Sequence, residues 1–272
     1  GMKQMSEGLQ KTAGKRLRHI LAFLTNKPIM GVLVGTGVTA IIQSSSATTV
    51  MVVGFVNAGL MTLYQSIGVI MGANIGTTVT AQIVAFKLGD YAYHAIAVGG
   101  FTYLFAKKKT IQYIGQVLLG FGILFLGLNT MGNTMEPLGD SQFIKEVMRN
   151  FSNYPIFGVL AGMAVTVIIQ SSSATFGILV GLVHAGVIDY HAGIPVLLGS
   201  NIGTTVTAIL SSIGANLSAK RAAFAHFIFN VLGSGFIIGL LYLVPDFADK
   251  IEHLLNNFST TLGFKGNIGD ER

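Results

Sequence analysis

Apolar residues gather in long runs along this chain, and the lengths of the runs fall into two classes. The stretches Tyr91 to Ala106 with its flanks, Thr110 to Met131 and Ala222 to Val244 are long enough to cross a bilayer as helices, which takes roughly 20 residues. Between Pro28 and Gly59, in contrast, two apolar runs are each too short to cross alone. Helices satisfy their own backbone groups in lipid, so the pattern predicts an all-α integral membrane protein.

The two short runs are separated by the polar residues Gln43 to Ser46. This pattern favours a re-entrant helical hairpin with the polar residues at its tip, because non-helical backbone at membrane depth must line protein or a cavity. The alternative is one long helix whose serines bond back to their own carbonyls.

The next segment, Thr62 to Phe86, is long enough to cross but is interrupted near its middle by Gly72-Ala-Asn-Ile-Gly76 and three polar residues. We expect a broken transmembrane helix here. Two full helices are expected to follow it, before a more polar stretch from Gly132 to Asn153.

The same arrangement occurs twice. Thr39 to Thr48 returns as Thr166 to Thr175, and Asn74 to Thr80 returns as Asn201 to Thr207, in each case 127 residues further on. One broken helix and two whole helices separate the hairpins, and this odd number of crossings predicts inverted repeats. Inverted repeats with interrupted segments at matching positions are typical of secondary transporters that bind substrate near the midplane.

These patterns divide the chain into five predicted parts. The first part contains an amphipathic surface helix over about residues 5 to 24. The two ends of the chain look abrupt, and we expect that flanking helices are missing. The parts are a cytoplasmic amphipathic segment (1–27), repeat 1 (28–131), a connecting segment (132–154), repeat 2 (155–244) and a polar tail (245–272).

Charge sets the expected orientation. Charged residues make up 10% of the chain and the net charge is +6, whereas soluble domains carry about 25% charged residues. Most Lys and Arg residues, including Lys107 to Lys109, Lys220 and Arg221, fall on the side of the amino terminus. The positive-inside rule therefore predicts a cytoplasmic amino terminus.

Neutral polar groups dominate the candidate site. Neither Pro28 to Phe86 nor Pro155 to Ile188 contains Asp, Glu, Lys or Arg. Hydroxyl residues often only join membrane helices, but two matching blocks at hairpin tips favour a binding site. Free N–H groups at a helix amino terminus attract anions. Amide, hydroxyl and carbonyl oxygens can hold sodium, whose charge would offset that of the anion and couple the two ligands.

The expected anion-binding residues are the hairpin tips and the asparagines of the broken helices: Gln43, Ser44, Ser45, Ser46, Gln170, Ser171, Ser172, Ser173, Asn74 and Asn201. The expected sodium ligands overlap with them: Gln43, Gln170, Ser46, Ser173, Thr48, Thr175, Asn74, Thr77, Thr78, Asn201, Thr204 and Thr205. Gly72, Gly76, Gly199 and Gly203 are expected to let the backbone approach a small ligand closely.

At these residues the sequence resembles the sodium/phosphate cotransporter family, which comprises the type II transporters of animals and their bacterial relatives. The resemblance rests on the two Gln-Ser-Ser-Ser tips, the two Asn-Ile-Gly-Thr-Thr elements and the segment Ala225 to Asn230. It implies sodium-driven uptake of inorganic phosphate, by symport and alternating access, in a multi-pass protein of the bacterial inner membrane. No organic cofactor and no nucleic acid are expected.

Other interpretations stay open. The main one is a channel or passive pore for a small anion, and another is a symporter of a different oxyanion. An enzyme is not expected, because there is no Gly-x-Ser-x-Gly elbow and the absence of cysteine excludes a thiol nucleophile. Gly120, Gly122 and Gly127 indicate close helix packing that could join two protomers of a homodimer. For His226 we favour an interhelical hydrogen bond over a role in the site.

Overall fold

The computed structural model describes residues 4, 5, 7, 11, 28–85, 89–137, 141–244, 246, 247, 249–251, 253 and 254. All regular structure in this part of the chain is helical, which confirms the all-α prediction. The predicted amphipathic segment and polar tail lie almost entirely outside the described residues. The chain divides into two compact units, residues 1–231 and 232–272.

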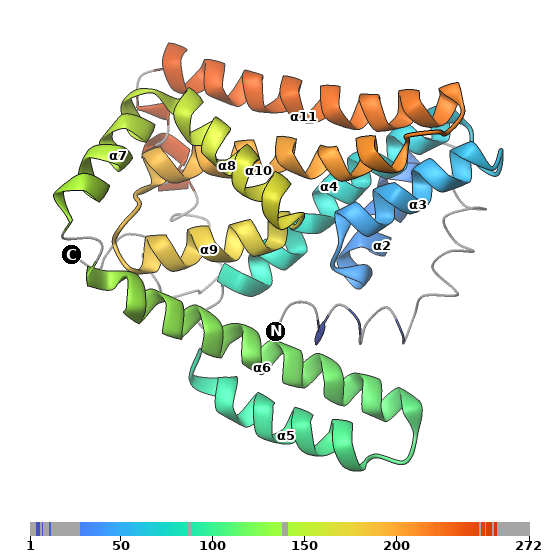
Figure 1. Cartoon of the computed structure of the whole chain (residues 1–272), viewed down its shortest axis with the longest axis horizontal. Helices are drawn as coiled ribbons and strands as arrows, with labels where there is room; N and C mark the ends of the chain where they lie inside the picture. The colour runs from blue at the N-terminus through green and yellow to red at the C-terminus, as the bar shows by residue number, and fades with distance from the viewer. Residues whose placement is uncertain are drawn as a thin grey trace. The chain divides into compact units, whose positions relative to one another are not determined.

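The helices follow the order that the repeat predicts (Figure 1). The last helix, α11 (Leu217–Leu243), begins in the first unit and continues into the second. The helices are α2 (Pro28–Ile42), α3 (Ser45–Asn57), α4 (Leu63–Ala85), the short η1 (Gly89–Tyr91), α5 (Ala92–Phe105), α6 (Lys109–Met135), α7 (Gln142–Asn153), α8 (Pro155–Ile169), α9 (Ser172–His184), α10 (Tyr190–Ser211) and α11 (Leu217–Leu243).

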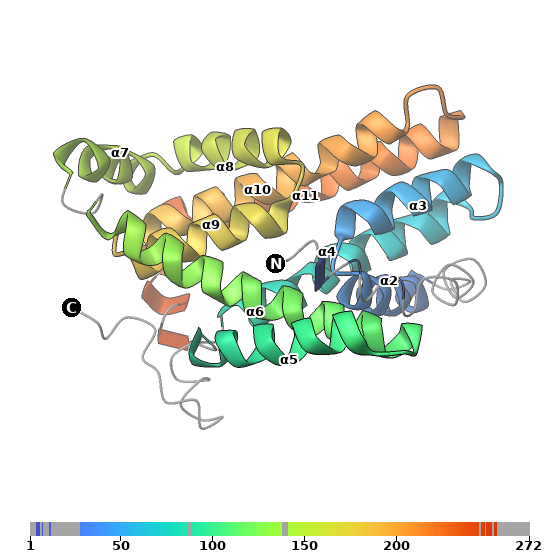
Figure 2. The ribbon, with the colours of Figure 1, turned by 60° about the horizontal axis from the view of Figure 1, so that its bottom comes forward.

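Each short apolar run forms its own helix, so the alternative of one long helix is wrong. Gln43 ends α2 in the left-handed backbone region, with a φ of 58°, and Gln170 ends α8 in the same way, with a φ of 60°. The following serines, Ser44 and Ser171, then cap α3 and α9 by accepting hydrogen bonds from the third backbone N–H beyond them. Figure 2 shows α2 and α3 as two separate helices. That the tips re-enter a membrane stays a prediction.

The prediction of broken helices is wrong, since α4 and α10 run without interruption through the Asn-Ile-Gly-Thr-Thr elements. The threonine hydroxyls do not free the backbone but bond back to it. Thr77 donates to the carbonyl of Ala73 at 3.1 Å, and Thr204 donates to that of Ser200 at 2.9 Å. Such bonds are compatible with a continuous helix in which no backbone group is released.

The glycines of these elements bring helices together instead of admitting a ligand, which corrects the expectation drawn from them. A Cβ on Gly72 would overlap the carbonyl oxygen of Val32 in α2, and a Cβ on Gly199 would overlap that of Val159 in α8. A Cβ on Gly76 would likewise overlap the carbonyl oxygen of Thr36 in α2, and one on Gly203 that of Met163 in α8. The pairs α2 with α4 and α8 with α10 are therefore in backbone contact, which fixes each hairpin to the helix that follows it.

Three helices in the described part of the chain are long and apolar enough to cross a membrane: α6, residues 191–211 of α10, and α11. α4 is not among them, and the 14 residues of α5 span only about 21 Å at 1.5 Å per residue. The crossing count behind the inverted repeat included both α4 and α5, so opposed orientation stays a prediction.

The glycines of α6 pack within this chain. A Cβ on Gly122 would meet the carbonyl oxygen of Ala92 in α5, whereas one on Gly127 would meet no atom of the described residues within 4 Å. α5 and α6 form an antiparallel pair (Figure 1). Gly122 therefore packs against a helix of its own chain and not against a second protomer. The homodimer stays a prediction.

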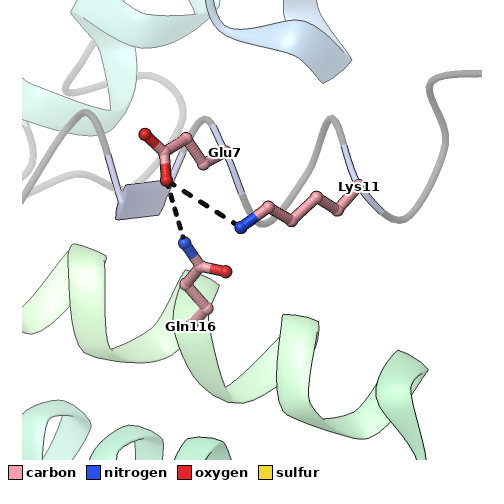
Figure 3. A network of polar contacts seen from close by, with 3 residues as sticks. All are labelled: Glu7, Lys11 and Gln116. Atoms are coloured by element: carbon pink, nitrogen blue, oxygen red, sulfur yellow. Dashed lines mark hydrogen bonds and ion pairs between the residues drawn. The ribbon is translucent and has the colours of Figure 1, made fainter.

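Two residues from the amino-terminal segment contact α6 through one polar network (Figure 3). The Glu7 carboxylate accepts a hydrogen bond from Nε2 of the buried Gln116 at 3.4 Å and lies 4.0 Å from the Lys11 ammonium. The Lys11 ammonium also lies 5.9 Å from the centre of the Tyr113 ring. Lys11 and Glu7 are half-exposed, so screening by solvent limits the stability that their ion pair contributes.

Asn216 ties the start of α11 to the end of α3. Its backbone N–H donates to Oδ1 of Asn57 at 2.8 Å, and its side-chain amide donates to the Asn57 carbonyl at 3.0 Å. Its own Oδ1 accepts from the backbone of Ala219 at 2.9 Å and caps α11. One side chain therefore joins a helix of repeat 2 to a helix of repeat 1.

We expect Asn216→Ala to lower the stability of the folded protein by about 1 kcal/mol, the usual cost of losing a helix cap. Thermal unfolding in detergent would measure it, with the exposed Ser218→Ala in the same helical turn as the control. Equal melting temperatures for the two variants would show that the Asn216 contacts contribute nothing.

Candidate functional site: two hairpin tips

The two Gln-Ser-Ser-Ser segments lie together although they are far apart in the sequence. Residues 43–46 and 170–173 line one pocket, and no other residue that the structure describes lines it. Its volume is about 40 Å³, whereas one water needs roughly 10–15 Å³. The space therefore suits a group of only a few non-hydrogen atoms, and the described residues that line it carry no formal charge.

Each tip brings two helix ends of opposite polarity to this pocket. The first tip joins the carboxyl end of α2 to the amino end of α3, and the second joins α8 to α9 in the same way. Helix amino ends carry about half a positive charge and carboxyl ends about half a negative charge. The pocket thus contains amide donors suited to an anion next to carbonyl acceptors suited to a cation.

Gln43 is held firmly in the first tip. It is 8% exposed, its Oε1 accepts a hydrogen bond from the hydroxyl of Thr80 at 2.8 Å, and its Nε2 donates to the carbonyl of Ala40. Thr80 itself is 2% exposed. α4 therefore fixes the orientation of the Gln43 amide.

Gln170 is held less completely in the second tip. Its Nε2 donates to the carbonyl of Val167 at 2.7 Å, as in the first tip, but the residue is exposed. Thr207, which matches Thr80, donates to the carbonyl of Thr204 instead of to the glutamine. The two tips share their backbone geometry and differ in how α4 and α10 support them.

Thr48 and Thr175 lie behind the tips and outside the pocket lining. Both are buried and accept hydrogen bonds from the matching threonines of the preceding helix, Thr39 at 3.0 Å and Thr166 at 2.9 Å. Each also donates to the carbonyl of the capping serine. These threonines therefore join the two helices of each hairpin directly below its tip.

The predicted site residues of α4 and α10 do not line the pocket. Asn74 accepts a hydrogen bond from Nε2 of His226 at 3.3 Å when the ring carries its proton on that nitrogen. Asn201 is exposed. The hydroxyls of Thr77, Thr78, Thr204 and Thr205 all donate to carbonyls of their own helix.

Several supporting residues were missing from the sequence prediction, namely Thr80, Thr39, Thr166 and Ser200. Ser200 lies 2.9 Å from the hydroxyl of Thr166 and so links α10 to α8. The signal for three of them was present, because Thr39, Thr166 and Thr80 stand at the ends of the repeated blocks. Ser200 gave no such signal, since repeat 1 has Ala73 at the matching position.

The interhelical hydrogen bond predicted for His226 is present. Among the described residues, no group of three or more His, Cys, Asp and Glu side chains is placed to hold a metal ion. The oxygens around the tips are amide, hydroxyl and backbone oxygens, which is the ligand type that hard cations prefer.

Known proteins match along nearly the whole chain. The family model described as "Na+/Pi-cotransporter" matches residues 1–133 and 135–260. The "Uncharacterized protein YqeW" of Bacillus subtilis is 34% identical over 97% of this chain and 89% of its own length. No solved structure matches.

Two further relatives have functional names. The "Putative inorganic phosphate export protein YjbB" of Escherichia coli is 28% identical over 90% of this chain, which spans 45% of that protein. The human "Sodium-dependent phosphate transport protein 2C" is 35% identical over 50% of this chain and 23% of its own length. This chain is a membrane protein that belongs to the Na+/Pi-cotransporter family, a family of phosphate transporters and not of enzymes.

Proposed function

We propose that the chain carries inorganic phosphate across the membrane together with sodium, by alternating access between two inverted repeats. The observation that carries the proposal is the single small pocket lined by both Gln-Ser-Ser-Ser tips. A site shared between repeats can open to either side when one repeat moves against the other. The proposal includes a cytoplasmic amino terminus in a bacterial inner membrane and re-entrant tips.

Phosphate would bind at the amino ends of α3 and α9. The first N–H groups of these helices have no partner within the helix, and Ser45, Ser46, Ser172 and Ser173 add hydroxyl donors around the pocket. Two helix ends, each attracting an anion, meet at one small space. This arrangement suits a compact anion with several oxygen acceptors.

Sodium would bind on the carbonyl side of the tips, near Gln43 and Gln170. The carbonyl ends of α2 and α8 attract a cation, and an amide oxygen has two lone pairs. Gln43 Oε1 therefore keeps acceptor capacity while it bonds to Thr80. Because the pocket lining is neutral, a bound cation would be the countercharge for phosphate, and each ligand would tighten the other.

The test is uptake of labelled phosphate into vesicles that contain the purified protein. We expect phosphate to accumulate above its external concentration under an inward sodium gradient and not under a matched potassium gradient. If phosphate only reached its external concentration, and did so equally in sodium and in potassium, the protein would be a passive pore and not a transporter. Competition by sulfate and arsenate in the same vesicles would show whether another oxyanion is the preferred substrate.

The direction of transport needs a second measurement, because one relative is named for phosphate export and another for sodium-dependent phosphate transport. Vesicles loaded with phosphate and sodium would report efflux under an outward sodium gradient. A symporter runs either way according to its gradients, so we expect sodium-dependent flux in both arrangements.

A further inference from the structure

Asn74 does not line the pocket, yet it belongs to a repeated motif, and its partly buried side chain faces a helix of the other repeat. Its Oδ1 is 3.3 Å from Nε2 of His226 on α11. His226 is 0% exposed, and neither its Nδ1 nor Nδ2 of Asn74, both inaccessible to solvent, has a hydrogen-bond partner among the described residues. A buried polar pair that is only partly satisfied costs free energy, which argues for a role beyond packing.

α4 connects this pair to the pocket. Asn74 and Thr80 lie about 9 Å apart along the helix and about 120° apart around it, so one faces α11 while the other faces the first tip. Thr80 donates to Oε1 of Gln43 at 2.8 Å. A shift of α4 at Asn74 would therefore move the group that orients Gln43.

The face of α4 that carries Gly72 and Gly76 is held against α2. A change at the face that contacts α11 therefore also affects the packing of α4 on α2. Gly72 and Gly76, on either side of Asn74, lie in backbone contact with α2. α11 in turn is tied to α3 by Asn216 and Asn57. The contacts of α11 thus reach α3 of the first hairpin and α4, the helix that follows the hairpin.

We propose that His226 is a positioning residue for the first tip, acting through Asn74 and α4 on the amide of Gln43. It touches neither of the proposed ligands. In this arrangement the last helix of repeat 2, α11, sets the geometry of the binding residues of repeat 1. The proposal rests on the proposed function for its consequence in transport, but the positioning itself can be tested without transport.

The transport test compares the concentrations of phosphate and sodium that give half-maximal uptake. We expect His226→Ala and Asn74→Ala each to raise both concentrations about five- to tenfold, and the double variant to be no worse than either, as for residues acting as one unit. His226→Gln should restore values to within about twofold, because its amide can donate to Asn74. Asn230→Ala is the matched control, since the side-chain amide of Asn230 donates to the backbone carbonyl of His226 within the same helix.

A labelling test reads the tip directly and needs no transport. The chain contains no cysteine, so Ser46→Cys places one thiol at the pocket. We expect its rate of maleimide labelling to change severalfold with His226→Ala and to stay within about twofold with Asn230→Ala. Where His226→Ala does not fold, Asn74→Ala replaces it in the comparison.

An unchanged labelling rate would overturn the positioning role whether or not the wild type transports phosphate. Normal half-maximal concentrations in a transporting His226→Ala protein, or additive losses in the double variant, would overturn it as well. A wild type without sodium-dependent transport would instead contradict the proposed function and leave the labelling result to decide the role of His226.

Discussion

Replacing either glutamine of the tips by alanine is expected to reduce sodium-dependent phosphate uptake by roughly ten- to hundredfold. Gln43 and Gln170 line the pocket and are the residues whose amide oxygens are proposed to hold sodium. A hydrogen bond to a charged group contributes about 1.5–3 kcal/mol, and 1.4 kcal/mol corresponds to a tenfold change in binding. The measurement is initial uptake into vesicles at fixed sodium and phosphate concentrations.

The same two variants should differ in stability. Gln43→Ala leaves the buried hydroxyl of Thr80 without its acceptor, which costs about 1–3 kcal/mol. Gln170 is exposed, so its removal should leave the melting temperature nearly unchanged. Gln82→Ala, at an exposed glutamine of α4, is the control and should preserve both uptake and stability. Normal uptake by both tip variants would exclude these glutamines from the site.

The hairpins and the meeting of their tips could be predicted from the sequence, because the signal was local and repeated. A polar block of four residues between short apolar runs cannot stay within one apolar helix without cost. The repeat then gave two such blocks, and polar groups in an apolar surrounding are most stable where they face each other. Residues 43–46 and 170–173 do share one pocket.

The role of the Asn-Ile-Gly-Thr-Thr elements could not be predicted in the same way, since glycine and threonine have two uses in membrane helices. They can interrupt a helix, or they can let two helices approach while the threonines bond back to their own carbonyls. Only the position of the neighbouring helix decides between these uses. Gly72 and Gly199 face the backbones of α2 and α8, so the second use holds.

The hydrogen-bond partner of Asn74 could not be predicted from the sequence either. His226 comes more than a hundred residues later, and the repeat offers no counterpart for this contact, because Asn201 is exposed. The two halves share a motif but differ in which helix covers it. A sequence repeat predicts the contacts that both halves share. A contact that only one half makes can be found only from the packing of the whole chain.

Close packing of α2 on α4 gives the largest expected effect on folding. A Cβ on Gly35 would overlap the carbonyl oxygen of Val69, which is backbone and cannot rotate away. At Gly37, two residues further along the same helix, a Cβ would have no atom of the described part of the chain within 4 Å. The two glycines are therefore a matched pair that differs in what faces them.

We expect Gly35→Ala to separate the two helices and lower stability by at least about 1–3 kcal/mol, the range for overpacked sites. Gly37→Ala should be neutral or stabilising by about 0.5–1 kcal/mol, because alanine is the better helix former. Thermal unfolding in detergent would rank the variants, and uptake would fall with Gly35→Ala alone, since α2 carries the first tip. Equal stability of the two variants would show that α2 and α4 are not in backbone contact, and the fixed orientation of Gln43 by Thr80 would lose its basis.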